Sequence, residues 1–376
     1  MRASRLIAIA AAAGISAVIL GCAAPTASGP IANGPASTTS PTPRVDAAAA
    51  FIAIVTDPAF SARIERTGTL TTNGVPRPDS GTYEFDAAYE HSAYVDDAGG
   101  GEEIVSRHDS SMAVRTGNGP WIAFDDGDPG SLASAIQGLH DLRDDGLDVR
   151  DGVALHHLVT RPEGGITLED LGLGHDVSAG SATIEFWVRD DGTPVEGRLT
   201  TDSEYVDGTV IHWDSAMRFT AIGQIEISMP GDVWMPFASE RQGYQIAFPP
   251  DLGAAEGTGT GPDIFTTADG QSAVVLMEPQ PAGAGLTAYE RAFVEATFKD
   301  TKRSQDASRT VETGERTWRV LEYPNLAGDE PMFVQYALTV RGTDGVIVGY
   351  FGPTGDETND RRTLEQILGT ITLSER

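Results

Sequence analysis

Few residues of this chain have the types and spacing that metal binding requires. His156 and His157 are its only adjacent pair of histidines. Neighbouring residues of a strand point to opposite faces of a sheet, so these two side chains cannot easily bind one ion. The sequence has no HExxH pattern and no group of cysteines and histidines typical of a zinc site. We therefore expect no metal and no cofactor.

Two acidic clusters, at residues 125–128 and 141–151, could bind calcium through their carboxylates. An EF-hand loop that began at Asp141 would place Arg143 at its third position and Gly152 at its twelfth, where a glutamate is required. The pattern does not fit. We interpret the clusters as solvated acidic turns, and weak calcium binding at the surface is the alternative.

The sequence offers no recognisable catalytic frame. It has no Gly-x-Ser-x-Gly motif, which an α/β-hydrolase serine would need. The glycine-rich segment 257–261 lacks the Lys-Ser/Thr of a phosphate-binding loop. Paired carboxylates of the glycosidase kind have many candidates in so acidic a chain, and nothing selects one pair. We predict that the protein is not an enzyme.

The single cysteine, Cys22, follows a leader-like segment. Arg2 and Arg5 precede a mainly apolar run over residues 6–20, which is shorter than the roughly 20 residues of a transmembrane helix and suits a secretory signal. Ile19-Leu20-Gly21-Cys22 resembles the bacterial lipobox, which implies acylation of the Cys22 thiol and cleavage before it. Residues 1–21 are then a lipoprotein signal peptide. An ordinary signal peptide, or an uncleaved anchor, is the alternative.

The residues after Cys22 predict a flexible tether to the membrane. Residues 23–45 contain five prolines and many small residues, with Arg44 as the single charge. Such a segment cannot bury enough apolar surface to fold. We therefore interpret residues 22–45 as the lipidated cysteine and a disordered tether, and we expect the rest of the chain on the extracytoplasmic face of the cell membrane.

The composition is that of a folded protein with an acidic surface. Of its 376 residues, 40% are hydrophobic and 22% are charged, with a net charge of −29 that becomes about −31 without the two leader arginines. Binding of nucleic acid needs a cationic surface, so this charge argues against it. It also argues against a polybasic membrane-binding patch.

From Asp46 onward the pattern predicts an α+β fold made largely of antiparallel strands. Asp46 suits the N-cap of a helix that ends near Pro58. The hairpin signal Asp190-Asp191-Gly192 joins two strands, and the runs at 205–213 and 216–229 extend the same sheet. Prolines at 230 and 236 predict a domain boundary, with domains at 46–230 and 237–374. Further helices are expected at residues 130–141, 286–299 and 360–369.

The first domain resembles the LppX/LprG-type lipoproteins of actinobacteria, which are relatives in fold of the LolA lipoprotein carrier. The residues that carry the resemblance are the segments Arg66–Leu70, Val114–Ile122 and Phe186–Val195. The resemblance implies a curved antiparallel half-barrel sheet whose apolar cavity is closed by helices and holds acyl chains or glycolipids.

Residues 237–374 resemble the small PsbP-like domains of actinobacterial lipoproteins. The segments Gly243–Pro250, Thr317–Tyr323, Gln335–Thr339 and Leu364–Ile371 carry this resemblance. It implies a smaller α/β sandwich, an antiparallel sheet with helices on its faces, and no shared catalytic residues.

Two functions fit these observations. In the first, the protein binds or carries an apolar ligand such as a lipid or glycolipid, since ligand pockets are mostly apolar. The candidate lining residues are Leu132, Ile136 and Leu139 on the covering helix, and Ile184, Phe186 and Val188 on the hairpin; plain core packing is the alternative for all six. In the second, the chain is an envelope scaffold whose acidic surface selects a protein partner. A dry cavity would favour the first function and a filled core the second.

Overall fold

The computed structural model describes eleven stretches of the chain. These are residues 46–95, 101–107, 111–124, 132–160, 167–171, 173, 176–254, 261–298, 307–313, 316–324 and 331–374. The predicted signal peptide, Cys22, the predicted tether and the acidic cluster at 125–128 lie outside them. Within these stretches, no helix combines the length and the apolar composition needed to cross a bilayer.

The described residues group into two compact units. Unit 1 contains the described residues within 46–60, 64–80 and 132–220. Unit 2 contains those within 61–63, 81–124 and 221–374. The division passes through strand β2 (Val75–Phe85), so the long sheet described next contributes strands to both units.

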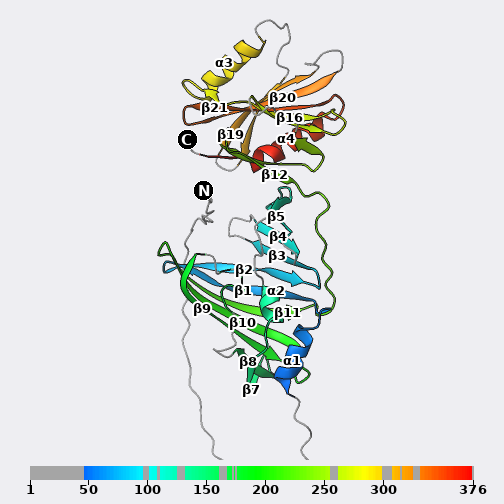
Figure 1. The fold of residues 1–376 in the computed structure, drawn as a ribbon, viewed down its shortest axis with the longest axis vertical. Helices are drawn as coiled ribbons and strands as arrows, with labels where there is room; N and C mark the ends of the chain where they lie inside the picture. The colour runs from blue at the N-terminus through cyan, green and yellow to red at the C-terminus, as the bar shows by residue number, and fades with distance from the viewer. Residues whose placement is uncertain are drawn as a thin grey trace, which may run out of the picture. The chain divides into compact units, whose positions relative to one another are not determined.

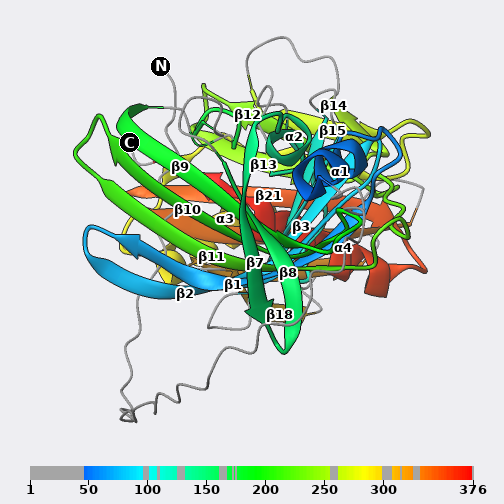
Figure 2. The same cartoon turned by 90° about the horizontal axis from the view of Figure 1, so that it is seen from below.

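An eleven-stranded sheet holds all the described strands between residues 62 and 220, in the order β6-β5-β4-β3-β2-β1-β11-β10-β9-β8-β7. Besides β2, its strands are β1 (Ala62–Thr72), β3 (Tyr89–Val95), β4 (Gly101–Arg107), β5 (Met112–Thr116), β6 (Ile122–Phe124), β7 (Leu142–Arg150), β8 (Val153–Thr160), β9 (Val177–Val188), β10 (Pro194–Tyr205) and β11 (Val210–Thr220). Strands β9, β10 and β11 are long and curved (Figure 2). The expectation of a mainly antiparallel fold with few helices is confirmed; closure into a half-barrel stays a prediction.

Alternation of side chains gives this sheet one apolar face. In β1, Ala62 and Ile64 are buried while Arg63 and Glu65 are exposed. In β9, Ile184, Phe186 and Val188 share the buried face, as their spacing predicts. Trp187 points to the other face and is still only 4% exposed, because neighbouring side chains cover its ring.

Two short helices of unit 1 lie side by side, α1 (Ala47–Val55) and α2 (Leu132–Gln137) (Figure 2). Asp46 caps α1 as predicted: its Oδ1 accepts a hydrogen bond of 3.1 Å from the N–H of Ala49. Helix α2 is shorter than the predicted helix at 130–141. It stops before Gly138, and Leu139 follows outside the helix but stays buried. Gly138 ends the helix because glycine is a poor helix residue.

The interpretation of residues 141–151 as a turn is wrong. Strand β7 occupies most of the segment and pairs with β8, so only the link between the two strands turns. Its carboxylates are bonded rather than simply solvated: the Asp144 Oδ2 atom lies 2.9 Å from Nδ1 of His156, and Asp148 accepts a hydrogen bond of 3.0 Å from the Trp187 indole. Partners from β8 and β9 therefore allow an acidic sequence to form a strand.

The runs predicted as two strands at 205–213 and 216–229 form one. A turn at Asp207-Gly208 precedes β11, and the described strand ends at Thr220. The glycine adopts a φ of 84°, which L-residues rarely adopt.

The remaining strands of unit 2 form two further sheets. A three-stranded sheet has the order β12-β13-β22, and the larger one has the order β14-β15-β16-β21-β20-β19-β18, with β17 paired to β21. The strands are β12 (Met235–Ser239), β13 (Tyr244–Phe248), β14 (Leu252–Ala254), β15 (Asp263–Thr267), β16 (Ala273–Leu276), β17 (Gln280–Pro281), β18 (Ala307–Thr313), β19 (Arg316–Pro324), β20 (Met332–Arg341), β21 (Asp344–Pro353) and β22 (Thr372–Leu373).

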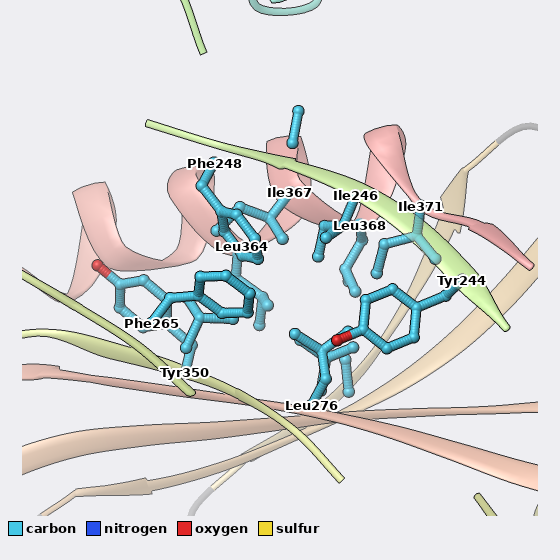
Figure 3. Packing of buried hydrophobic residues seen from close by; sticks show 14 of the residues in the cluster. Tyr244, Ile246, Phe248, Phe265, Leu276, Tyr350, Leu364, Ile367, Leu368 and Ile371 are labelled. Carbon is cyan, nitrogen blue, oxygen red and sulfur yellow. The ribbon is translucent and has the colours of Figure 1, made fainter. Parts of the chain in front are cut away.

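Helices α3 (Leu286–Phe298) and α4 (Glu357–Thr370) cover opposite faces of the larger sheet (Figure 1). Alternate residues of β20 explain this arrangement: Ala337 packs in the cluster under α4, while Tyr336 and Leu338 pack in the cluster under α3. Both faces of the sheet are buried at β20 and β21. The sequences of these two strands are therefore apolar along most of their length. Figure 3 shows Leu364, Ile367 and Leu368 of α4 directed towards this core, as predicted from their spacing.

A buried carboxylate, Glu322 of β19, is held by two arginines of unit 2. Arg361 donates two hydrogen bonds of 2.9 Å to it, and Nε of Arg309 donates one of 3.0 Å. Burial raises the pKa of Glu322, but the hydrogen bonds from Arg361 and Arg309 outweigh it, so the net pKa lies below the ordinary value.

We expect Glu322→Ala to lower the free energy of unfolding by about 3–5 kcal/mol, because the two guanidinium groups lose their shared carboxylate. In the wild type, the stabilisation from Glu322 should be present above the unfolded pKa near 4.5 and lost as the pH falls through the lower, folded pKa. Urea unfolding of the wild type and the variant at several pH values measures both effects. A cost under 1 kcal/mol at neutral pH would contradict the prediction.

Candidate functional site

An aromatic layer joins helix α1 to the buried face of the long sheet within unit 1. The ring centroids of Phe51 and Phe186 lie 4.6 Å apart, and those of Phe186 and Phe219 lie 6.2 Å apart. Phe51 comes from α1, Phe186 from β9 and Phe219 from β11. Ring pairs at such distances add to the stabilisation from burial alone. The layer therefore anchors the short helix on the sheet through Phe51.

All six residues predicted to line a ligand cavity are buried in unit 1. Ile136, Ile184, Phe186 and Val188 are 0% exposed, Leu139 is 2% exposed and Leu132 is 8% exposed. None of them lines the pocket described next. Their part in ligand binding stays a prediction.

A pocket of about 430 Å³ opens where α1 meets the start of β7. Ala48, Ala49 and Ile52 of α1 and Leu142 of β7 give it apolar surface. The volume is within the range of roughly 300–1,000 Å³ that is usual for small-molecule sites. The pocket borders the same helix that packs on the aromatic layer, so a ligand seated here would contact α1 directly.

Charged and polar side chains form the larger part of the pocket lining. Asp46, Asp141 and Asp144 line the pocket together with His140 and Arg143. The Arg143 guanidinium donates a hydrogen bond of 2.5 Å from Nε to Asp145 and lowers the pKa of that carboxyl. The charged groups of the lining can therefore interact with a polar headgroup while Ala48, Ala49 and Ile52 contact an apolar chain.

The turn between β9 and β10 packs directly against α1. At Gly192, a Cβ atom would lie 2.5 Å from backbone atoms of both Ala50 and Phe51. Real Cβ atoms do not approach backbone so closely. Gly192 also has a φ of 83°, which favours glycine. The missing side chain at this position thus lets α1 lie against the turn.

The adjacent histidines have separate surroundings. His156 lies between Asp144, at 2.9 Å from Nδ1, and Asp190, at 3.3 Å from Nε2. The ring of His157 stacks on Trp187 with centroids 4.7 Å apart. Among the residues that the structure describes, no three His, Asp or Glu side chains are placed to hold a metal ion.

The residues that line the α1 pocket were not predicted from the sequence as a site. The spacing of Phe51, Ile52 and Val55 predicts the apolar side of α1, but it gives no indication that Ala48 and Ile52 border a pocket together with the exposed Ala49. Their only signal is that α1 is unusually rich in alanine. Small side chains leave space beside a helix, and that space becomes visible only when β7 is placed.

Comparison with the models of protein families finds no match, and comparison with curated proteins finds none either. Among solved structures, cyanobacterial PsbP (CyanoP) from Synechocystis sp. PCC 6803 matches with 11% identity and a TM-score of 0.31, over 39% of this chain and 98% of its own. LprF from Mycobacterium bovis matches with 11% identity and a TM-score of 0.30, over 51% of this chain and 99% of its own. The LolA superfamily protein NE2245 from Nitrosomonas europaea matches with 10% identity and a TM-score of 0.23, over 48% of this chain and 94% of its own.

Representatives of the groups that the sequence resembles are thus among the structural neighbours of the chain, at low identity and over part of its length. These values do not assign the chain to a family.

Proposed function

We propose that this protein is a lipid-anchored lipoprotein on the extracytoplasmic face of the cell membrane that binds an apolar ligand beside helix α1 and catalyses no reaction. The observation that carries the proposal is the pocket of about 430 Å³ between α1 and β7, whose lining combines apolar side chains of both elements with charged and polar ones. This combination suits an amphiphile, whose chain leaves water while its headgroup stays hydrated.

The short helix α1 gives such a ligand a way to reach the aromatic layer. An isolated helix of nine residues is not stable in water, so α1 depends on its packing. That packing comes from four buried residues, Ala47, Ala48, Phe51 and Val55. An acyl chain could replace their contacts with the sheet, since the hydrophobic effect is not directional.

Native mass spectrometry on residues 46–376, produced without the leader in a bacterial host and followed by solvent extraction, tests the proposal. We expect a stoichiometric mass shift that extracts as lipid, and uptake of a fluorescent fatty acid by the emptied protein. We expect Ile52→Glu to reduce this uptake at least tenfold, because it places a charge in the pocket wall. Leu147→Glu on β7 is the matched control, since Leu147 is 66% exposed outside the pocket lining and its variant should keep uptake.

The anchor has a separate test. We expect Cys22→Ala to abolish labelling by a radioactive fatty acid and to release the protein from the membrane fraction, because no other cysteine can form the thioether. Ser28→Ala in the same segment should change neither result. Retention of the label by Cys22→Ala would contradict the lipobox prediction.

A second function, binding of a protein partner, is favoured by one observation on the β7–β8 hairpin. Leu147 and Val149 lie on one face of β7 there and are 66% and 67% exposed. Exposed apolar side chains gathered on one hairpin suit an interaction surface. A bare mass in the experiment above, with no uptake of fatty acid, would select this function and would overturn the first.

A further inference from the structure

Unit 2 contains a second pocket, of about 310 Å³, beside the first turn of α4. Buried Trp234, Leu252 and Tyr350 form part of its wall. Three carboxylates, Asp251, Asp356 and Asp360, line it as well. The described lining contains no arginine or lysine. This pocket therefore presents negative charge and aromatic surface to whatever enters it.

Asp360 is an unusual member of this lining because its carboxylate is buried. The residue is 3% exposed, and its Oδ1 accepts a hydrogen bond of 3.1 Å from the Tyr350 hydroxyl. Its Oδ2 has no hydrogen-bond partner among the described residues. Leaving a buried acceptor unpaired costs free energy, and leaving a buried charge unpaired costs more. A carboxylate in this position needs either a proton or a ligand that donates to it.

The fold makes room for this carboxylate. Gly352 on β21 faces Asp360, and a Cβ atom at that position would lie 2.5 Å from Oδ2. Gly352 has no positive φ to explain its identity. The glycine therefore serves the placement of the Asp360 side chain rather than a turn.

We propose that this acidic pocket binds a small organic cation, whose ammonium or guanidinium group donates hydrogen bonds to Oδ2 of Asp360. The volume is at the lower end of ligand pockets, which suits a free small molecule. Trp234 and Tyr350 add aromatic surface of the kind that attracts cations. A metal ion is a poorer fit, because no three carboxylates or histidines of the described residues are placed to hold one.

The affinity of this site should depend on pH. Tyr350 on β21, Asp251 after β13, and Asp356 and Glu357 at the start of α4 are the ionisable groups around Asp360. Burial is the largest effect and raises the pKa of Asp360 to about 6; the Tyr350 hydrogen bond, the next largest effect, lowers it, and repulsion from Asp356 and Glu357 raises it further. A bound cation requires the ionised form, so the affinity should fall as the pH drops below 6.

Isothermal titration calorimetry of the full chain with agmatine, which carries both an ammonium and a guanidinium group, tests the proposal. We expect binding at pH 7.5 that weakens about tenfold at pH 5, because only about a tenth of a group with a pKa of 6 is ionised there. Asp360→Asn should weaken binding at pH 7.5 at least tenfold and remove this pH dependence. Thermal melting of the same samples shows that the variant is folded.

The matched control is Glu278→Gln, which removes one negative charge from an exposed side chain outside the pocket. It should bind agmatine as the wild type does. An equal loss in Glu278→Gln and Asp360→Asn would show attraction by the net charge of the protein and would overturn the site. Absence of binding to the wild type would also overturn it. Tighter binding of an acetylated arginine tripeptide than of agmatine would reject a free small molecule as the ligand.

Discussion

Gly192→Ala should lower the free energy of unfolding of unit 1 by about 2–5 kcal/mol. Two effects add in this variant. The alanine must adopt a left-handed backbone conformation, which costs about 1–2 kcal/mol. Its Cβ must also displace the backbone of α1 at Ala50 and Phe51, and overpacking of this kind costs about 1–3 kcal/mol more. Urea unfolding followed by circular dichroism, with hydrogen exchange of the α1 amides, measures the total and locates it.

Gly208→Ala is a control that separates the two effects. The β10–β11 turn repeats the β9–β10 turn: Gly208 has a φ of 84° and Gly192 one of 83°. Each glycine donates a hydrogen bond of 2.9 Å to the carbonyl three residues earlier. A Cβ at Gly208, however, would meet no atom within 4 Å. Gly208→Ala should therefore cost only the backbone strain, and equal costs in the two variants would contradict the contact with α1.

The same pair of variants bears on ligand binding. If an apolar ligand displaces α1, a variant whose helix is already loosened binds it with less loss of packing. Gly192→Ala should therefore take up the fluorescent fatty acid more readily than the wild type, and Gly208→Ala should not. Reduced uptake in Gly192→Ala alone would show that the ligand needs α1 in its observed position.

Asp360→Asn should raise the free energy of unfolding at pH 7.5 by up to about 3 kcal/mol. The pKa of Asp360 is about 6 in the folded protein against a usual value of 3.8, so folding favours the protonated carboxyl. The contribution of Asp360 to stability is thus greatest below pH 3.8 and is lost as the pH rises from 3.8 through 6. The asparagine side chain of the variant does not ionise, so its stability does not fall in this way as the pH rises.

Unfolding of the wild type and the variant by urea between pH 4 and pH 8 measures the effect. The two proteins should have similar stability at pH 4 and should diverge as the pH rises through 6. Glu278→Gln should show no such divergence, because its side chain is exposed. A difference between wild type and Asp360→Asn that is constant across this range would contradict a raised pKa.

Sequence patterns predict the helices and most strands of this protein because burial repeats along them. Phe51 and Val55 predict the buried side of α1, and Leu364, Ile367 and Leu368 predict that of α4. Strand β7 was not predicted, because its carboxylates look like a solvated turn until β8 and β9 supply their partners. The composition of a segment does not indicate a hydrogen-bond partner that lies more than ten residues away in the sequence.

The sequence predicts the two candidate sites less well than it predicts the fold. Asp360 lies one turn before Leu364 on the inward stripe of α4, and an acid at such a position is the one signal that could have indicated its pocket. Trp234 and Tyr350 come from distant segments, and nothing local links them to it. In unit 1, the six predicted residues are all buried, but the pocket is lined by residues of α1 and of the segment 140–144, which are distant in the sequence and which no local pattern links.

The order of strands in the long sheet has a consequence for folding kinetics. Strands β2 to β6 follow one another as neighbours, and so do β7 to β11, whereas β1 pairs with β11 from the far end of the segment. The N–H of Asn73 bonds to the carbonyl of Val210, and the N–H of Gly223 bonds to that of Ser61. Each neighbouring hairpin closes a short loop, but the bonds between β1 and β11 and at their ends join residues 137 or more apart. Contacts between residues far apart in the sequence form slowly. We therefore expect the pairing of β1 with β11 to form more slowly than the hairpins on either side of it.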